Sequence, residues 1–100
     1  MYGRKYYMIY DEILAKVENA RGQILGIIED NVIYYDDLQR IIHFNADADY
    51  IAKAIREILD IKYAHAVEIP IYGMWNDYGA IILSEDLVEQ AKELLEKHYK

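Results

Sequence analysis

The spacing of apolar residues changes from a helical period to a strand period near Ile61, and this change limits what the chain can fold into. Upstream, apolar residues recur three and four positions apart, first at positions 6, 10, 13, 17, 20, 24 and 27, which is the stripe of an amphipathic helix. Downstream, "KYAHAVEIPIY" alternates in the way of a strand with one buried face. Helices followed by a hairpin predict an α+β domain that is mainly helical.

The first stripe predicts one long helix from about Lys5 to Asp30. Gly22 and Gly26 lie inside it, and each costs about 1 kcal/mol relative to alanine in a helix interior. Two explanations remain open: the glycines permit another backbone to approach closely, or they mark a bend. The stripe repeats every seven residues, so we expect a homodimer through the terminal helices, although the same stripe also suits packing of the core.

Two shorter helices are expected after a β-favouring run. The run is "NVIYY" (31–35), and "DDLQRIIHF" after it predicts a short helix with Asp36 as its N-cap. The turn "NADAD", in which Asn45 or Asp47 acts as cap, leads into a helix that ends near Leu59. The residues of that helix expected to face the core are Ala48, Ile51, Ile55, Ile58 and Leu59.

The second half predicts a hairpin and a last helix. The alternating run and the apolar "AIIL" (80–83) enclose "GMWNDYG", whose glycines and Asn-Asp pair suit a turn. Ser84 is placed to cap the helix over residues 85–99, and the acidic Glu85 and Asp86 favour the positive end of its dipole.

This order of elements resembles the winged helix-turn-helix family, and so does the string "YYDDLQRII…YIAKAIREIL". Ile51, Ile55 and Ile58 match the apolar spacing of the family's second motif helix. The resemblance covers about residues 11–84 of a single domain (1–100) and implies a winged-helix fold of the small archaeal or archaeal-virus type, with the hairpin as the wing. Where the family often has a tight glycine turn, this chain has His43 and a longer turn.

Composition narrows the class of protein. One hundred residues suffice for one domain, and the absence of cysteine excludes disulfides and thiolate chemistry. Without a signal-peptide pattern or a span of about 20 apolar residues, we expect a soluble, cytoplasmic protein. Sixteen isoleucines and eleven tyrosines against one serine and no threonine suggest a thermophilic, archaeal source, although an AT-rich genome gives the same bias.

Few residues suit catalysis or metal binding. Ser84 is the only serine, and a helix cap is its simplest role. Asn45, Asp47 and Asp49 begin like a calcium loop, but other residues fill the loop's glycine and glutamate positions. His43 could join one of these aspartates, yet nothing fixes their geometry. We therefore predict no enzyme activity, no catalytic residue, no metal and no cofactor.

The resemblance implies that the exposed side of helix 48–59 enters the major groove of double-stranded DNA. Lys53 and Arg56 suit phosphate or guanine, and Tyr50 can stack or donate to phosphate, whereas aspartates there repel phosphate. The family's contact positions correspond here to Asp47, Asp49, Tyr50, Lys53, Ala54, Arg56 and Glu57, with Arg40 on the preceding helix.

The hairpin tip favours a different partner. Binding wings usually carry Arg or Lys, but "YGMWNDYG" has no cation and carries Tyr72, Met74, Trp75 and Tyr78. Such residues are enriched at protein interfaces, or else they fold back onto the domain. A net charge of −7 also counts against nucleic acid. Two functions therefore remain: a small DNA-binding transcriptional regulator, or a winged-helix subunit that binds protein in a transcription or replication assembly.

Overall fold

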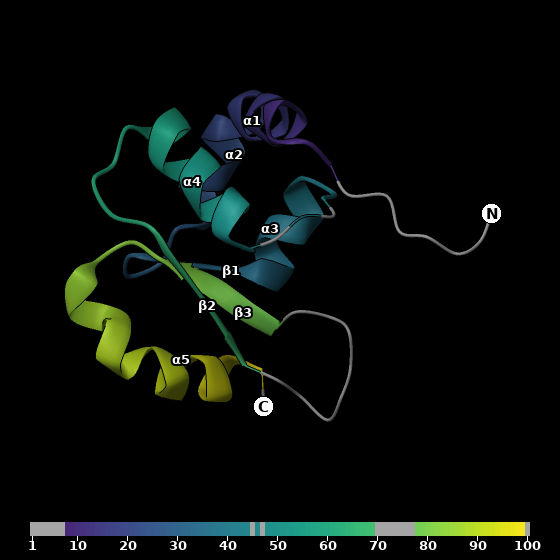
Figure 1. The fold of residues 1–100 in the computed structure, drawn as a ribbon. Coiled ribbons are helices and arrows are strands. Elements are labelled where there is room, and N and C mark those ends of the chain that lie inside the picture. The colour runs from purple at the N-terminus through teal and green to yellow at the C-terminus, as the bar shows by residue number, and fades with distance from the viewer. Residues whose placement is uncertain (1–7, 45, 47, 70–77, 100) are drawn as a thin grey trace.

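A three-stranded antiparallel sheet separates two helical layers (Figure 1). The strands β1 (Val32–Tyr34), β2 (His65–Ile69) and β3 (Tyr78–Ile82) pair in the order β1-β3-β2. The central strand β3 therefore bonds to both others, with Ile33 opposite Ile81 and Ala66 opposite the same residue on the other side. The computed structural model describes residues 8–44, 46, 48–69 and 78–99.

The larger layer covers one face of the sheet and contains four helices (Figure 1). They are α1 (Tyr10–Asn19), α2 (Arg21–Ile27), α3 (Tyr35–Ile41) and α4 (Ala48–Leu59). Their apolar stripes meet Ile33 and Ile81 of the sheet, and the fully buried side chains among them include Ile13, Val17, Ile24, Leu38, Ile51 and Ile55. The main core of the domain lies here.

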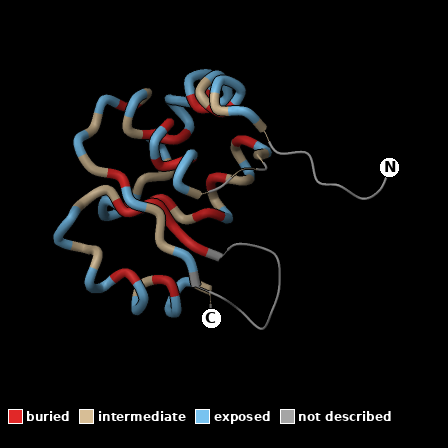
Figure 2. The backbone as a smooth tube through the Cα atoms, in the orientation of Figure 1, coloured by how far each residue is buried: buried red, intermediate tan, exposed pale blue. Residues whose placement is uncertain are grey.

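The smaller layer covers the opposite face of the sheet. A 3-10 helix, η1 (Glu85–Gln90), leads into α5 (Ala91–His98). Ala91 and Leu95 pack against Val32, Ala80 and Ile82, the strand residues that alternate with those facing the main core. Figure 2 shows the buried segments concentrated in the sheet and on the inner sides of the helices. Two covered faces explain why β3 reads as a continuous apolar run rather than an alternating one.

The mainly helical α+β class is confirmed, but the single long first helix is wrong. Its described part begins at Tyr10 and breaks at Ala20, whose φ of −106° and ψ of 14° leave the helical region. A Cβ built at Gly22 or Gly26 would meet nothing within 4 Å. The glycines therefore do not admit another backbone, and a bend next to Gly22 is what the structure contains.

The expected helix caps also differ. The helix α3 begins one residue early, so Asp36 lies in its first turn and Tyr34 occupies the N-cap position. Ser84 does occupy the N-cap position of η1, but its hydroxyl makes no cap hydrogen bond with the described residues. The other expected caps, Asn45 and Asp47, lie outside the described residues. None of the helices in the described part of the chain has the length and apolar character that crossing a membrane requires.

Gly79 fixes how closely β2 and β3 approach. A Cβ at Gly79 would clash with the carbonyl oxygen of Val67 and lie 3.2 Å from the Cα of Glu68, and both are backbone atoms that cannot move aside. Only glycine fits at this point of the sheet without shifting the neighbouring strand.

Gly79→Ala is expected to lower the free energy of unfolding by about 2 kcal/mol, because the added methyl group overpacks against backbone. The matched control is Gly26→Ala, which meets open space in a helix and should raise that free energy by about 1 kcal/mol. Urea unfolding of the two variants measures both values. Equal effects of the two substitutions would contradict the close approach at Gly79.

Candidate nucleic-acid interface

The helix α4 buries one side and exposes the other. Ile51, Ile55 and Leu59 lie in the main core as expected, and Ile58 is partly buried. Ala54 is also completely buried, so the expectation that it contacts DNA is wrong. The reason is that the helix packs against both α1 and β2, and this widens its buried side beyond a single stripe.

Asp49, Tyr50 and Lys53 are exposed as expected, but Tyr10 of α1 flanks them. The ring centroids of Tyr10 and Tyr50 are 6.0 Å apart, and Nζ of Lys53 lies 4.7 Å from the centroid of the Tyr10 ring. A cation at this distance is attracted to the face of the ring. Tyr50 and Lys53 therefore form one surface with Tyr10, a residue that the sequence pattern did not predict to be part of it.

The surroundings of the Tyr10 hydroxyl disfavour its negatively charged, deprotonated form. Burial, reinforced by the carboxylate of Glu57, raises the pKa of Tyr10 to about 12. Tyr10 therefore remains neutral throughout the physiological range and contributes no negative charge beside Lys53.

Arg56 is partly buried and has a structural partner. Its Nη1 donates a hydrogen bond of 2.9 Å to the carbonyl oxygen of Ala64, just before β2. The bond ties the last turn of α4 to the start of the hairpin, and Asp60 with a φ of 55° turns the chain between them. A guanidinium has five donors, so Arg56 can still present others to a ligand.

Arg40 interacts with residues of its own helix, α3, and not with the exposed residues of α4 described above. Its Nη2 is 2.6 Å from Oδ1 of Asp37 and 3.9 Å from Oδ2 of Asp36, all on α3. These two carboxylates offset the positive charge of Arg40, the residue that the resemblance expects to contact the DNA backbone. Arg40 would have to exchange an ion pair for a phosphate contact.

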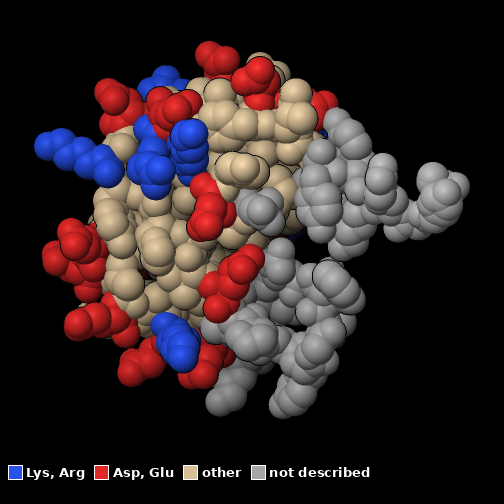
Figure 3. Space-filling model, viewed as in Figure 1, with Lys and Arg blue, Asp and Glu red and all other residues tan. Residues whose placement is uncertain are grey.

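Charge is unevenly distributed over the two layers. On α4 the two anions Asp49 and Glu57 offset the two cations Lys53 and Arg56. The segment 85–98 carries five acidic residues and two lysines. In Figure 3 the Lys and Arg side chains gather over the region of α4, while acidic side chains surround the region of α5. The surface of α4 is therefore the less repulsive of the two toward an anionic ligand.

The expected partner-binding hairpin tip cannot be placed. Tyr72, Met74 and Trp75 lie outside the described residues, and of Tyr78 only the backbone is described, paired with Ile69. The described part of the interface is thus the exposed side of α4, where the structure brings Tyr50, Lys53 and Tyr10 together.

Comparisons with protein-family models, with curated proteins and with solved structures give no significant match.

Replacing Arg56 with Ala is expected to lower the free energy of unfolding by about 2 kcal/mol, because it removes a charge-assisted hydrogen bond that holds α4 to the hairpin. Lys92→Ala on the exposed side of α5 serves as control and should change stability by no more than about 0.5 kcal/mol. Urea unfolding measures both. If Arg56→Ala is as mild as the control, the bond to Ala64 is not structural.

Proposed function

We propose that this protein is a winged-helix DNA-binding protein, a small regulator that places α4 in the major groove. The observation that carries the proposal is the order β1-β3-β2 with α3 and α4 inserted between β1 and the β2–β3 hairpin. This is the arrangement expected of a helix-turn-helix pair followed by a wing, and it leaves one side of α4 exposed.

The dimensions of α4 suit the proposal. Its 12 residues give a length of about 18 Å, and the major groove, about 12 Å wide, admits one helix. Lys53 lies in the middle of the exposed side, with the 49% exposed Tyr50 one turn before it. Lys53 would bind a phosphate oxygen, and Tyr50 would stack or donate a hydrogen bond beside it.

The electrostatics set a limit on affinity. Because the net charge is −7 and the charges on α4 cancel, non-specific attraction to phosphate is expected to be weak. Binding should appear at low salt and fall steeply as salt rises.

The test is fluorescence anisotropy with a labelled duplex of random sequence, over a range of about 20 to 200 mM salt. Wild-type protein is expected to bind at low salt. Lys53→Glu should weaken binding about tenfold or more, because it replaces a phosphate ligand with a repelling charge.

The matched control is Lys92→Glu, which makes the same charge change on α5, across the sheet from α4. Screening over about 10 Å at 0.1 M salt should leave its affinity within about twofold of wild type. Absence of binding at low salt, or an equal loss in the two variants, would overturn the proposal.

A second candidate is a protein-binding subunit of a transcription or replication assembly. The excess of acidic residues on η1 and α5 favours it, because such a surface suits a basic protein partner and repels DNA. This candidate gains if the duplex is not bound. The homodimer stays a prediction. Val17 and Ile24, two residues of the stripe that suggested it, pack in the core of the same chain and are not exposed to a second copy.

A further inference from the structure

We propose that Asp36, Asp37 and His98 form a binding site for a divalent transition metal of the zinc class, at the junction of α3 and α5. The proposal is independent of DNA binding and departs from the sequence-based expectation of no metal. It rests on where the fold brings together residues from two distant parts of the chain.

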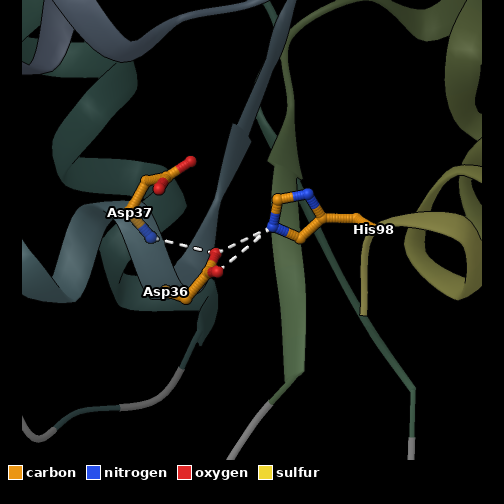
Figure 4. A group of neighbouring side chains, drawn as sticks. All are labelled: Asp36, Asp37 and His98. Carbon is orange, nitrogen blue, oxygen red and sulfur yellow. Dashed lines mark hydrogen bonds and ion pairs between the residues drawn. The ribbon is translucent and has the colours of Figure 1, made fainter. Parts of the chain in front are cut away.

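The three side chains lie close together, with Asp36 and His98 in contact and the Asp37 carboxylate turned away from them in Figure 4. Each offers one ligand atom, and these atoms all lie within 4.8 Å of one another. Figure 4 shows Nε2 of His98 directed at the Asp36 carboxylate, 3.1 Å from Oδ1 and 3.2 Å from Oδ2. Metal–ligand bonds of about 2.1 Å place tetrahedral donors about 3.4 Å apart, so the Asp37 side chain would rotate toward His98 to complete the site.

The chemistry of the donors selects the ion. An imidazole nitrogen with two carboxylates suits Zn²⁺ and its neighbours, whereas Mg²⁺ and Ca²⁺ prefer oxygen ligands alone. Three protein ligands on an accessible surface leave a fourth position for water. The side chains of Asp36 and His98 are 44% and 28% exposed, so an ion can reach them.

Neighbouring aromatic residues hold the ligands in position. The ring of Tyr34 in β1 stacks on His98 with centroids 3.7 Å apart and planes inclined by 5°. The Tyr99 hydroxyl lies 3.3 Å from Oδ1 of Asp36 and donates a 2.8 Å hydrogen bond to the carbonyl oxygen of Gly79. Metal ligands are usually oriented by such contacts with neighbouring residues. The side chains of a solvated acidic patch lack contacts of this kind.

Arg40 is the competitor for the site. Its guanidinium pairs with both aspartates, and its side chain is 73% exposed. An exposed ion pair contributes little stability, so an arriving ion can displace the guanidinium into solvent. Removing Arg40 should therefore strengthen metal binding. If Arg40 instead held Asp36 and Asp37 in place for the ion, its removal would weaken metal binding.

A bound ion would link two helices that lie far apart in the sequence. Asp36 and His98 are 62 residues apart in sequence, and an ion held by both would fasten α5 to α3. Because an ion that binds the folded state stabilises it by mass action, the melting temperature should rise with metal concentration.

The experiment titrates Zn²⁺ into the full chain, purified without a polyhistidine tag and stripped with a chelator, by calorimetry and thermal melting. The expected result is one ion per chain, a rise in melting temperature that the chelator reverses, and much weaker binding of Mg²⁺. His98→Asn should weaken zinc binding at least about tenfold, and Arg40→Gln should tighten it.

Two further variants keep the outcome decisive. His65→Asn removes another exposed histidine and should leave zinc binding unchanged. In Figure 4 no dashed line joins the Asp37 side chain to His98, so Asp37→Asn removes a ligand and tests the site even if His98→Asn loosens α5. Absence of saturable binding, binding that survives His98→Asn, or weaker binding in Arg40→Gln would each overturn the proposal.

Discussion

The fold depends on β3, which lies at the centre of the sheet and supplies core residues to both layers. Ile81 packs with the helices α1 to α4, whereas Ala80 and Ile82 pack with α5. Its backbone bonds to β1 on one side and β2 on the other. Because β1, β2, α3, η1 and α5 all contact this strand, the close approach at Gly79 sets the position of the hairpin relative to both layers.

The candidate interface follows from that arrangement. Packing of α4 against α1 and β2 leaves a narrow exposed side, on which Lys53 is central and Tyr10 forms one flank. Arg56 joins the same helix to the hairpin, so a substitution at Arg56 changes stability as well as any contact with DNA. DNA binding as proposed therefore depends mainly on Lys53 and Tyr50, and little on Arg56 and Arg40.

The sequence predicts the local structure well because apolar periodicity is a local property. The exposure of Lys53 and the burial of Ile51 and Ile55 follow from helical spacing alone. The break at Ala20 does not, since the apolar stripe continues through it without interruption. The burial of Ala54 also depends on two neighbouring elements whose placement no spacing in α4 contains.

Contacts between distant residues were the least predictable part of the site. The sequence places His98 only inside the helix predicted over residues 85–99, and Asp36 only at a helix cap. Their bond requires α5 to pack against β1, the strand that leads into Asp36, and this packing is a property of the whole fold. The stacking of Tyr34 on His98 depends on the same arrangement.

The most direct test of the account maps the DNA contact by nuclear magnetic resonance on ¹⁵N-labelled protein titrated with a short duplex at low salt. The account predicts that the largest shifts of amide signals fall in residues 49–57, around Lys53. Shifts centred on η1 and α5, or no shifts at all, would contradict the claim that α4 carries the function.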